Sequence, residues 1–276
     1  MRPLCAMGLA ATLAAGSLPA CETGQTTVEE VYPTGEALPE NLLRFYIYFS
    51  APMGQDDILP AIDLLDSAGQ RVDGVFLTNR FDLWSSDRTR LTLLLDPGRV
   101  KTGLNANRTL GRALVAGETY HLQISEAAHD AQGCPLATPH RVTFTVSEAD
   151  VSSPSPDTWA LLRPGVGTRD PLTVVLDGPI DHLSLAYRLR VIGPDGIPVP
   201  GRIGLENGET HWRFAPVAPW SGQEHQLAVD PMLEDLAGNQ PGTLFDQPVG
   251  LPETRWSPVL NWSPKPHEAG GPLSSD

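Results

Sequence analysis

The chain has 276 residues, 41% of them hydrophobic and 19% charged, so it can bury a core and is not disordered throughout. Its formal net charge of −14 argues against nucleic acid as a partner, because few cations are present to replace the counterions around phosphates. The 26 glycines and 27 prolines favour short strands and turns over helices.

Residues 1–20 have the pattern of an export signal. Arg2 is their only charged residue, an apolar run rich in alanine and leucine follows, and Leu18-Pro19-Ala20-Cys21 ends the run. This ending resembles the lipobox of bacterial lipoproteins, which implies that Cys21 is lipidated and that the chain contacts a membrane through a lipid anchor only. An ordinary signal cut after Ala20, or a buried first helix, are the alternatives.

The segment after the signal predicts a tether. Residues 21–40 are polar and acidic and contain Pro33 and Pro39. With Cys5 inside the signal and Cys21 carrying lipid, Cys134 would be left alone, as a small apolar filler or a spare thiol.

A first β-rich body is expected over residues 41–150. Between Leu43 and Phe49, hydrophobic and polar residues alternate with a period of two, which predicts a half-buried strand. Further strand-like runs cover residues 62–65, 90–95, 120–124 and 142–146, with glycine, proline and aspartate turns between them.

An insertion interrupts this first body at residues 98–116. It holds Lys101, Arg108 and Arg112 and is the most basic patch of an acidic protein. We interpret the insertion as a candidate partner-binding loop, because function concentrates on loops. The alternative is a solvated excursion that tolerates extra length.

A second body, over residues 158–248, repeats the first after a linker at 151–157. The repeat is carried by turn and core residues at held spacing. Pro52, Gly69, Val72 and Gly74 correspond to Pro179, Gly196, Val199 and Gly201, and Gly117, Leu122, Asp130 and Gly133 correspond to Gly222, Leu227, Asp235 and Gly238. A duplicated domain with an extra loop in one copy explains this pattern.

Residues 249–276 form a proline-rich tail that we expect to be flexible. Trp256-Ser257-Pro258 and Trp262-Ser263-Pro264 make a small repeat within it. The two tryptophans are candidate partner-binding residues, or they fold back onto the second body.

Two short motifs connect the chain to a known family. Phe49-Ser50-Ala51-Pro52-Met53 resembles the F-S-x-P-M signature of bacterial Ig-like domains of the S-layer type, and Asp235-Leu236-Ala237-Gly238-Asn239 resembles their D-x-A-G-N turn. Each copy holds one good motif and one worn one. The resemblance implies an all-β protein with two tandem Ig-like β-sandwiches, of the kind that act as spacers, adhesive modules or ligand-presenting units on bacterial surfaces.

The chemistry-bearing residues predict no cofactor, metal site or catalytic site. Asp235 and Asn239 suit turn chemistry better than calcium, which needs six to eight oxygen ligands. No zinc motif, nucleophile elbow or nucleotide-binding loop occurs. His121, His129 and His140 are the least implausible metal ligands. His129 and His140 flank one turn, which can bring them together in space, and His121 precedes that turn.

The sequence therefore predicts an exported, lipid-anchored envelope protein that acts as a non-catalytic interaction or structural module. Its partner would be an envelope protein or a surface polymer. The alternative function is carriage of a small ligand or metal ion through the three histidines, and an enzyme comes third because no catalytic motif is present.

Overall fold

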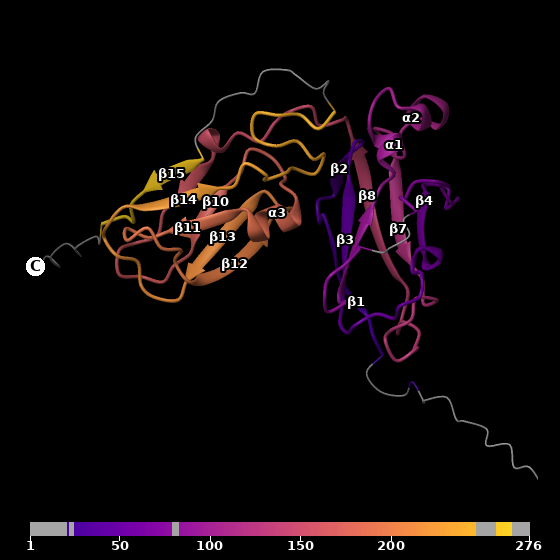
Figure 1. The fold of residues 1–276 in the computed structure, drawn as a ribbon, viewed down its shortest axis with the longest axis horizontal. Helices are drawn as coiled ribbons and strands as arrows, with labels where there is room; N and C mark the ends of the chain where they lie inside the picture. Colours follow the sequence, from indigo (N-terminus) through magenta and orange to yellow (C-terminus); the bar gives the residue numbers. More distant parts are fainter. Residues whose placement is uncertain (1–20, 22–24, 79–82, 247–257, 267–276) are drawn as a thin grey trace, which may run out of the picture.

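The computed structural model describes residues 21, 25–78, 83–246 and 258–266. They form two β-sandwiches that lie beside each other and touch along one side (Figure 1). The predicted all-β class with two tandem Ig-like sandwiches is confirmed. No helix of the described residues is long and apolar enough to cross a membrane. The predicted export signal, residues 1–20, lies outside the described part.

Sandwich 1 has two four-stranded sheets. The first runs in the order β1 (Val28–Tyr32), β3 (Arg44–Phe49), β6 (Arg90–Leu94) and β5 (Leu83–Trp84). The second runs β2 (Ala37–Pro39), β8 (His140–Ser147), β7 (Thr119–Ile124) and β4 (Ile62–Asp66). Short helices η1 (Leu59–Ala61), α1 (Pro97–Val100) and α2 (Asn105–Leu110) sit in the connections. Alternate residues of the central strands, among them Phe45, Ile47, Leu122 and Phe144, fill the core between the sheets.

Sandwich 2 repeats this plan with fewer strands. One sheet runs β12 (Gly201–Glu206), β13 (His211–Pro216), β10 (Leu172–Val175) and β9 (Ala160–Leu162). The other runs β11 (Leu189–Ile192), β14 (His225–Val229) and β15 (Val259–Trp262). The helices are η2 (Pro156–Thr158) and α3 (His182–Tyr187). Trp212 and Phe214 stack at the centre of its core.

The duplication seen in the sequence is a duplication of backbone geometry. In sandwich 1 Met53 forms an antiparallel bridge with Asp130, and in sandwich 2 Ile180 forms the same bridge with Asp235. Gly133 and Gly238 follow these aspartates at φ 79° and 80°, a conformation in which an L side chain is strained. Glycine recurs at this spacing because both turns need positive φ.

Two of the expected boundaries differ from the structure. The expected tether, residues 21–40, contains β1 and β2, which pair with β3 and β8. The expected tail, residues 249–276, contains β15, which pairs with β14 and places Trp262 in the core of sandwich 2 at 4% exposure. These three strands lie at sheet edges. Hydrogen bonds to the neighbouring strand hold them there, so their sequences need not alternate between apolar and polar residues.

Candidate functional site

The inserted loop contacts both sandwiches. The Nζ of Lys101 lies 4.1 Å from the ring centre of Phe245, and the backbone N–H of Thr102 donates to Asp246. Arg112 pairs with Glu40 at 3.0 Å and reaches Asp246 at 4.0 Å. Two of the three predicted partner-binding cations therefore have partners within the chain and brace sandwich 1 against the 245–246 segment.

Arg108 is the exposed member of that predicted set, on α2. The organising residue of the loop is Arg99, which the sequence analysis missed. It is buried, and its guanidinium donates to the carbonyl oxygens of Asp73, Gly111 and Arg112 at 2.9–3.1 Å. A buried arginine that ties loop carbonyls together leaves no local sequence signature, because its acceptors are backbone atoms.

The three candidate histidines are not assembled into a metal site. Nδ1 of His121 lies 2.8 Å from the hydroxyl of Thr143, and burial alone lowers the pKa of His140. Within the described ranges no group of three or more His, Cys, Asp or Glu side chains could hold a metal ion. Trp262 is buried and is therefore not an exposed docking residue, whereas Trp256 lies outside the described residues.

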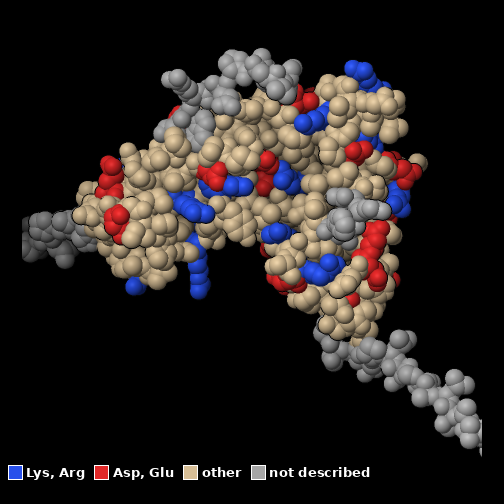
Figure 2. Space-filling view, in the orientation of Figure 1, with Lys and Arg blue, Asp and Glu red and all other residues tan. Residues whose placement is uncertain are grey.

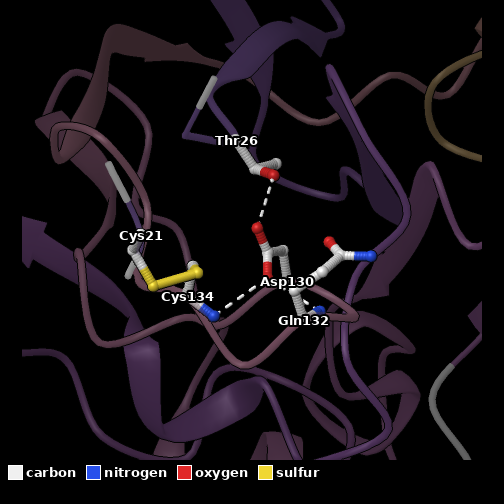
Figure 3. The surroundings of a disulfide bond; sticks show 5 residues. All are labelled: Cys21, Thr26, Asp130, Gln132 and Cys134. Carbon is white, nitrogen blue, oxygen red and sulfur yellow. Dashed lines mark hydrogen bonds between the residues drawn. A yellow bond between two sulfur atoms is a disulfide. The ribbon is translucent and has the colours of Figure 1, made fainter. Parts of the chain in front are cut away.

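Cys134 is not alone, which corrects the sequence expectation. It forms a disulfide with Cys21, and the two Cα atoms are 5.7 Å apart (Figure 3). Beside the bond the buried carboxylate of Asp130 accepts from the backbone N–H groups of Gln132 and Cys134 and from the hydroxyl of Thr26. One sulfur atom cannot hold both a disulfide and a lipid thioether, so this structure is that of a chain without lipid at Cys21.

At the position equivalent to Cys134, sandwich 2 has a residue that makes hydrogen bonds in place of the disulfide. Asn239 stands where Cys134 stands in the first copy. Its side-chain amide donates to the carbonyl oxygens of Asp150 and Ser152, which precede the first strand of sandwich 2. In both copies the residue after the turn glycine thus fastens the segment that enters the sandwich, once covalently and once by hydrogen bonds. Cys21 belongs to the folded body for this reason.

The two sandwiches meet along an interface that we call the seam. At its centre the hydroxyl of Tyr46 on β3 donates to the carboxylate of Asp181, the N-cap of α3, at 2.9 Å. Arg44 of the same strand pairs with Glu234 and lies 3.6 Å from Asp181. Burial raises the pKa of Asp181, and the Arg44 guanidinium opposes that shift.

A second part of the seam joins the β1–β2 connection to the β12–β13 turn. Glu209, 2% exposed, accepts from the backbone N–H and the hydroxyl of Thr34 at 2.9 and 2.7 Å. Burial raises the pKa of this carboxyl. Next to it a Cβ on Gly208 would lie 3.2 Å from the Cα of Gly35, a tight contact, and Gly208 has the positive φ of 61° that favours glycine.

Aromatic and apolar groups complete the seam. The ring of His182 stacks on Tyr32 with the centres 3.6 Å apart, and its Nε2 lies 2.9 Å from the hydroxyl of Tyr48. Leu236, which belongs to the turn of sandwich 2, is 5% exposed and packs into the core of sandwich 1. Its carbonyl accepts from the N–H of Leu43. The seam thus combines buried polar pairs with an apolar contact between the two sandwiches.

A cavity of about 500 Å³ opens beside the seam. It is lined by Arg44 and Tyr46 from sandwich 1 and by residues of α3, β11 and the turn at 230–234 from sandwich 2. Arg188 pairs there with Asp230 at 2.8 Å, and Ser184 accepts from the N–H of Glu234. None of these residues was a candidate in the sequence analysis, because they come from separate elements that no local pattern connects.

Comparison with known proteins finds only distant structural similarity. No family model matches the chain, and no curated protein sequence matches it. Among solved structures, a fragment of native alpha-2-macroglobulin from Escherichia coli that spans domains MG0-NIE-MG1 is 12% identical over 88% of this chain and 72% of that chain, with a TM-score of 0.29. The S-layer protein SbsC is 14% identical over 74% of this chain and 24% of that chain, with a TM-score of 0.32. A chimeric titin Z1Z2 is 11% identical over 75% and 89% of the two chains, with a TM-score of 0.24.

Proposed function

We propose that the chain is a non-catalytic structural and interaction module of a bacterial cell envelope. The observation that carries the proposal is the seam: buried polar pairs, aromatic stacking and an apolar contact join two sandwiches that a plain linker would leave free to move. A joined pair of sandwiches presents its loops and strand edges at fixed spacing to an envelope protein or a surface polymer. The export-like residues 1–20 and the Ig-like motifs support the envelope location.

Membrane attachment through lipid at Cys21 remains an alternative state within this proposal. A lipidated Cys21 would leave Cys134 reduced and the entering segment fastened only by Thr26 and its neighbours. Mass spectrometry of the N-terminal peptide from native cells distinguishes the two states. An N-terminal peptide that is disulfide-linked to the peptide containing Cys134 supports the disulfide. A diacylglyceryl mass on Cys21 supports the lipid anchor.

Cross-linking in intact cells tests the function. Because the chain has 33 acidic side chains, a carboxylate-reactive cross-linker covers its surface well, and mass spectrometry then identifies what is joined to it. We expect a reproducible envelope partner that is joined less when the seam is loosened by Leu236→Ala. If the wild-type chain gave no partner above the background of cells lacking it, the module function would be wrong and a carrier function would be favoured.

A further inference from the structure

Strand β12 forms one edge of its sheet, and the described part of the chain leaves this edge uncovered. It pairs with β13 alone, in an unbroken register over Gly201–Glu206. Five of its six residues are exposed, and the remaining one, Leu205, is half-buried. The strand lies along the lower border of sandwich 2 in Figure 1, and Figure 2 shows Lys and Arg side chains projecting from that border.

The other edge strands of the described residues are shorter, bulged or partly covered. Strands β2, β5, β9 and β15 have two to four residues each, and the register of β1 shifts between Val28 and Glu30. Residues that follow β4 and β11 bridge back onto these two strands. Proteins commonly protect a long edge with proline, a bulge or like charges. β12 has no proline and no bulge, and its charged residues, Arg202 and Glu206, have opposite signs.

The backbone of β12 offers free hydrogen-bonding groups on its outer side. The N–H of Val217 donates to the carbonyl of Pro200, which directly precedes β12. Because hydrogen bonds alternate along an antiparallel pair, every second residue of β12 bonds β13, and the residues between them direct N–H and C=O outward. The outward residues are Gly201, Ile203 and Leu205. Such a row of donors and acceptors can pair with another strand.

The sequence of β12 is complementary to itself when it is read in the opposite direction. Arg202 and Glu206 lie at equal distances from Gly204, and an apolar residue stands on each side of that glycine. In an antiparallel second copy centred on Gly204, Arg202 would lie opposite the partner's Glu206. Ile203 would lie opposite the partner's Leu205, and these two outward residues would exchange both of their backbone hydrogen bonds.

The inner face of the sheet supports this register. Ile203 and Leu205 lie opposite Phe214 and Trp212 of β13, which are core residues of sandwich 2. Leu205 already packs against that core, whereas Ile203 is 41% exposed at its margin. Pairing with a second copy would place each Ile203 beside a Leu205 and extend the apolar core across the edge.

The charges on the outer face select the same register. Arg202 is exposed and has no ion-pair partner among the described residues. Glu206 accepts from Arg213 at 2.6 Å through Oε1, which leaves Oε2 for a second cation. A pairing centred on Ile203 or Leu205 would also join outward backbone groups, but it would place neither charge opposite a charge of the other sign.

We propose that β12 pairs with β12 of a second copy of this chain, antiparallel and centred on Gly204. The two four-stranded sheets would then form one continuous sheet, in a closed two-fold dimer. This dimer goes beyond the proposed function, because a module presents its loops either alone or in pairs. The net charge of −14 does not prevent the pairing, since charges farther apart than about 8 Å are screened at physiological ionic strength.

Charge reversal tests the proposal by sedimentation velocity. The purified disulfide-bonded chain is measured at physiological ionic strength and at concentrations that rise into the millimolar range. The variants are Arg202→Glu and Glu206→Arg, at exposed positions where the fold tolerates substitution. Arg141→Glu is the matched control, because Arg141 is an exposed arginine on β8 of sandwich 1. Ile203→Pro removes an outward N–H that β13 does not use.

We expect the wild type and Arg141→Glu to dimerise as their concentration rises. Each reversal at Arg202 or Glu206 sets like charges opposite each other at both ends of the strand pair, and should weaken the dimer about tenfold or more. An equimolar mixture of these two variants should dimerise again, because one copy then carries only anions and the other only cations at these positions. Ile203→Pro should weaken the dimer with β12 still paired to β13.

Four results would overturn the inference. The wild type could remain monomeric throughout the concentration range, or the reversal variants could dimerise as tightly as the wild type. The mixture could remain monomeric, or Ile203→Pro could leave the dimer unchanged. The cross-linking of an envelope partner in cells is a separate measurement, so the proposed function stands or falls independently of the dimer.

Discussion

At the scale of single residues, the seam depends on ionisable groups kept in unusual environments. His182 is the clearest case: its ring stacks on Tyr32, and its buried Nδ1 has no hydrogen-bond partner among the described residues. Burial lowers the pKa of His182 to about 4, with Glu30 opposing that shift and Arg90 adding to it. The neutral imidazole is therefore the form that the folded seam holds.

The consequence is a loss of stability in mild acid. Because the folded pKa of His182 lies below the unfolded value of about 6.5, its contribution is present above pH 6.5 and disappears as the pH falls towards 4. We expect the free energy of unfolding of the wild type to fall by about 1–2 kcal/mol more than that of His182→Phe between pH 7 and 4, since the ring is only partly buried. Urea unfolding across this pH range measures the difference. Parallel curves for the two proteins would contradict it.

At the scale of elements, the two copies use one turn in two ways. Asp130 and Asp235 both accept backbone N–H groups, and the glycine that follows each adopts positive φ. The copies differ in what lies next to the glycine. A Cβ on Gly133 would meet open space, whereas a Cβ on Gly238 would lie 2.3 Å from Cδ1 of Leu43 in sandwich 1. The same turn is thus a free corner in one copy and a part of the seam in the other.

Matched alanine substitutions separate these two roles. Gly133→Ala should cost about 1–2 kcal/mol of stability, because an L residue is strained at positive φ. Gly238→Ala carries the same strain and in addition displaces Leu43, which adds about 1–3 kcal/mol. Chemical denaturation of the two variants measures the difference. Equal destabilisation would show that Leu43 moves away without cost and that the contact does not tighten the seam.

At the scale of the whole molecule, the side chain of Leu236 shows how the two copies of the domain contact each other. Leu236 follows Asp235 directly, and the first copy has the exposed Ala131 at the equivalent position. Leu236 is instead buried in the core of sandwich 1. The second copy therefore contributes a side chain to the core of the first, and we expect this contact to couple the unfolding of the two sandwiches.

This coupling predicts the shape of the thermal transition. The wild type should unfold in one calorimetric transition, because the sandwiches share buried groups. Leu236→Ala restores the residue of the first copy and should cost about 2–5 kcal/mol, enough to separate the transitions of the two sandwiches. Met232→Ala, at an exposed position outside both cores, is the control and should leave one transition. A single unshifted transition in Leu236→Ala would show that the seam does not depend on this contact.

The sequence by itself determined the fold class, the duplication and the turns, because alternation and positive-φ glycines are local properties that each residue expresses whatever lies nearby. It did not predict β1, β2 and β15 or the pairing of Cys21 with Cys134, and it directed attention to Lys101 and Arg112, which turn out to have internal partners. Only the tertiary structure decided the seam and the cavity beside it. Their residues come from strands and turns of separate domains, so no local pattern records which of them meet, and the shared burial that joins them exists only after the two sandwiches have packed together.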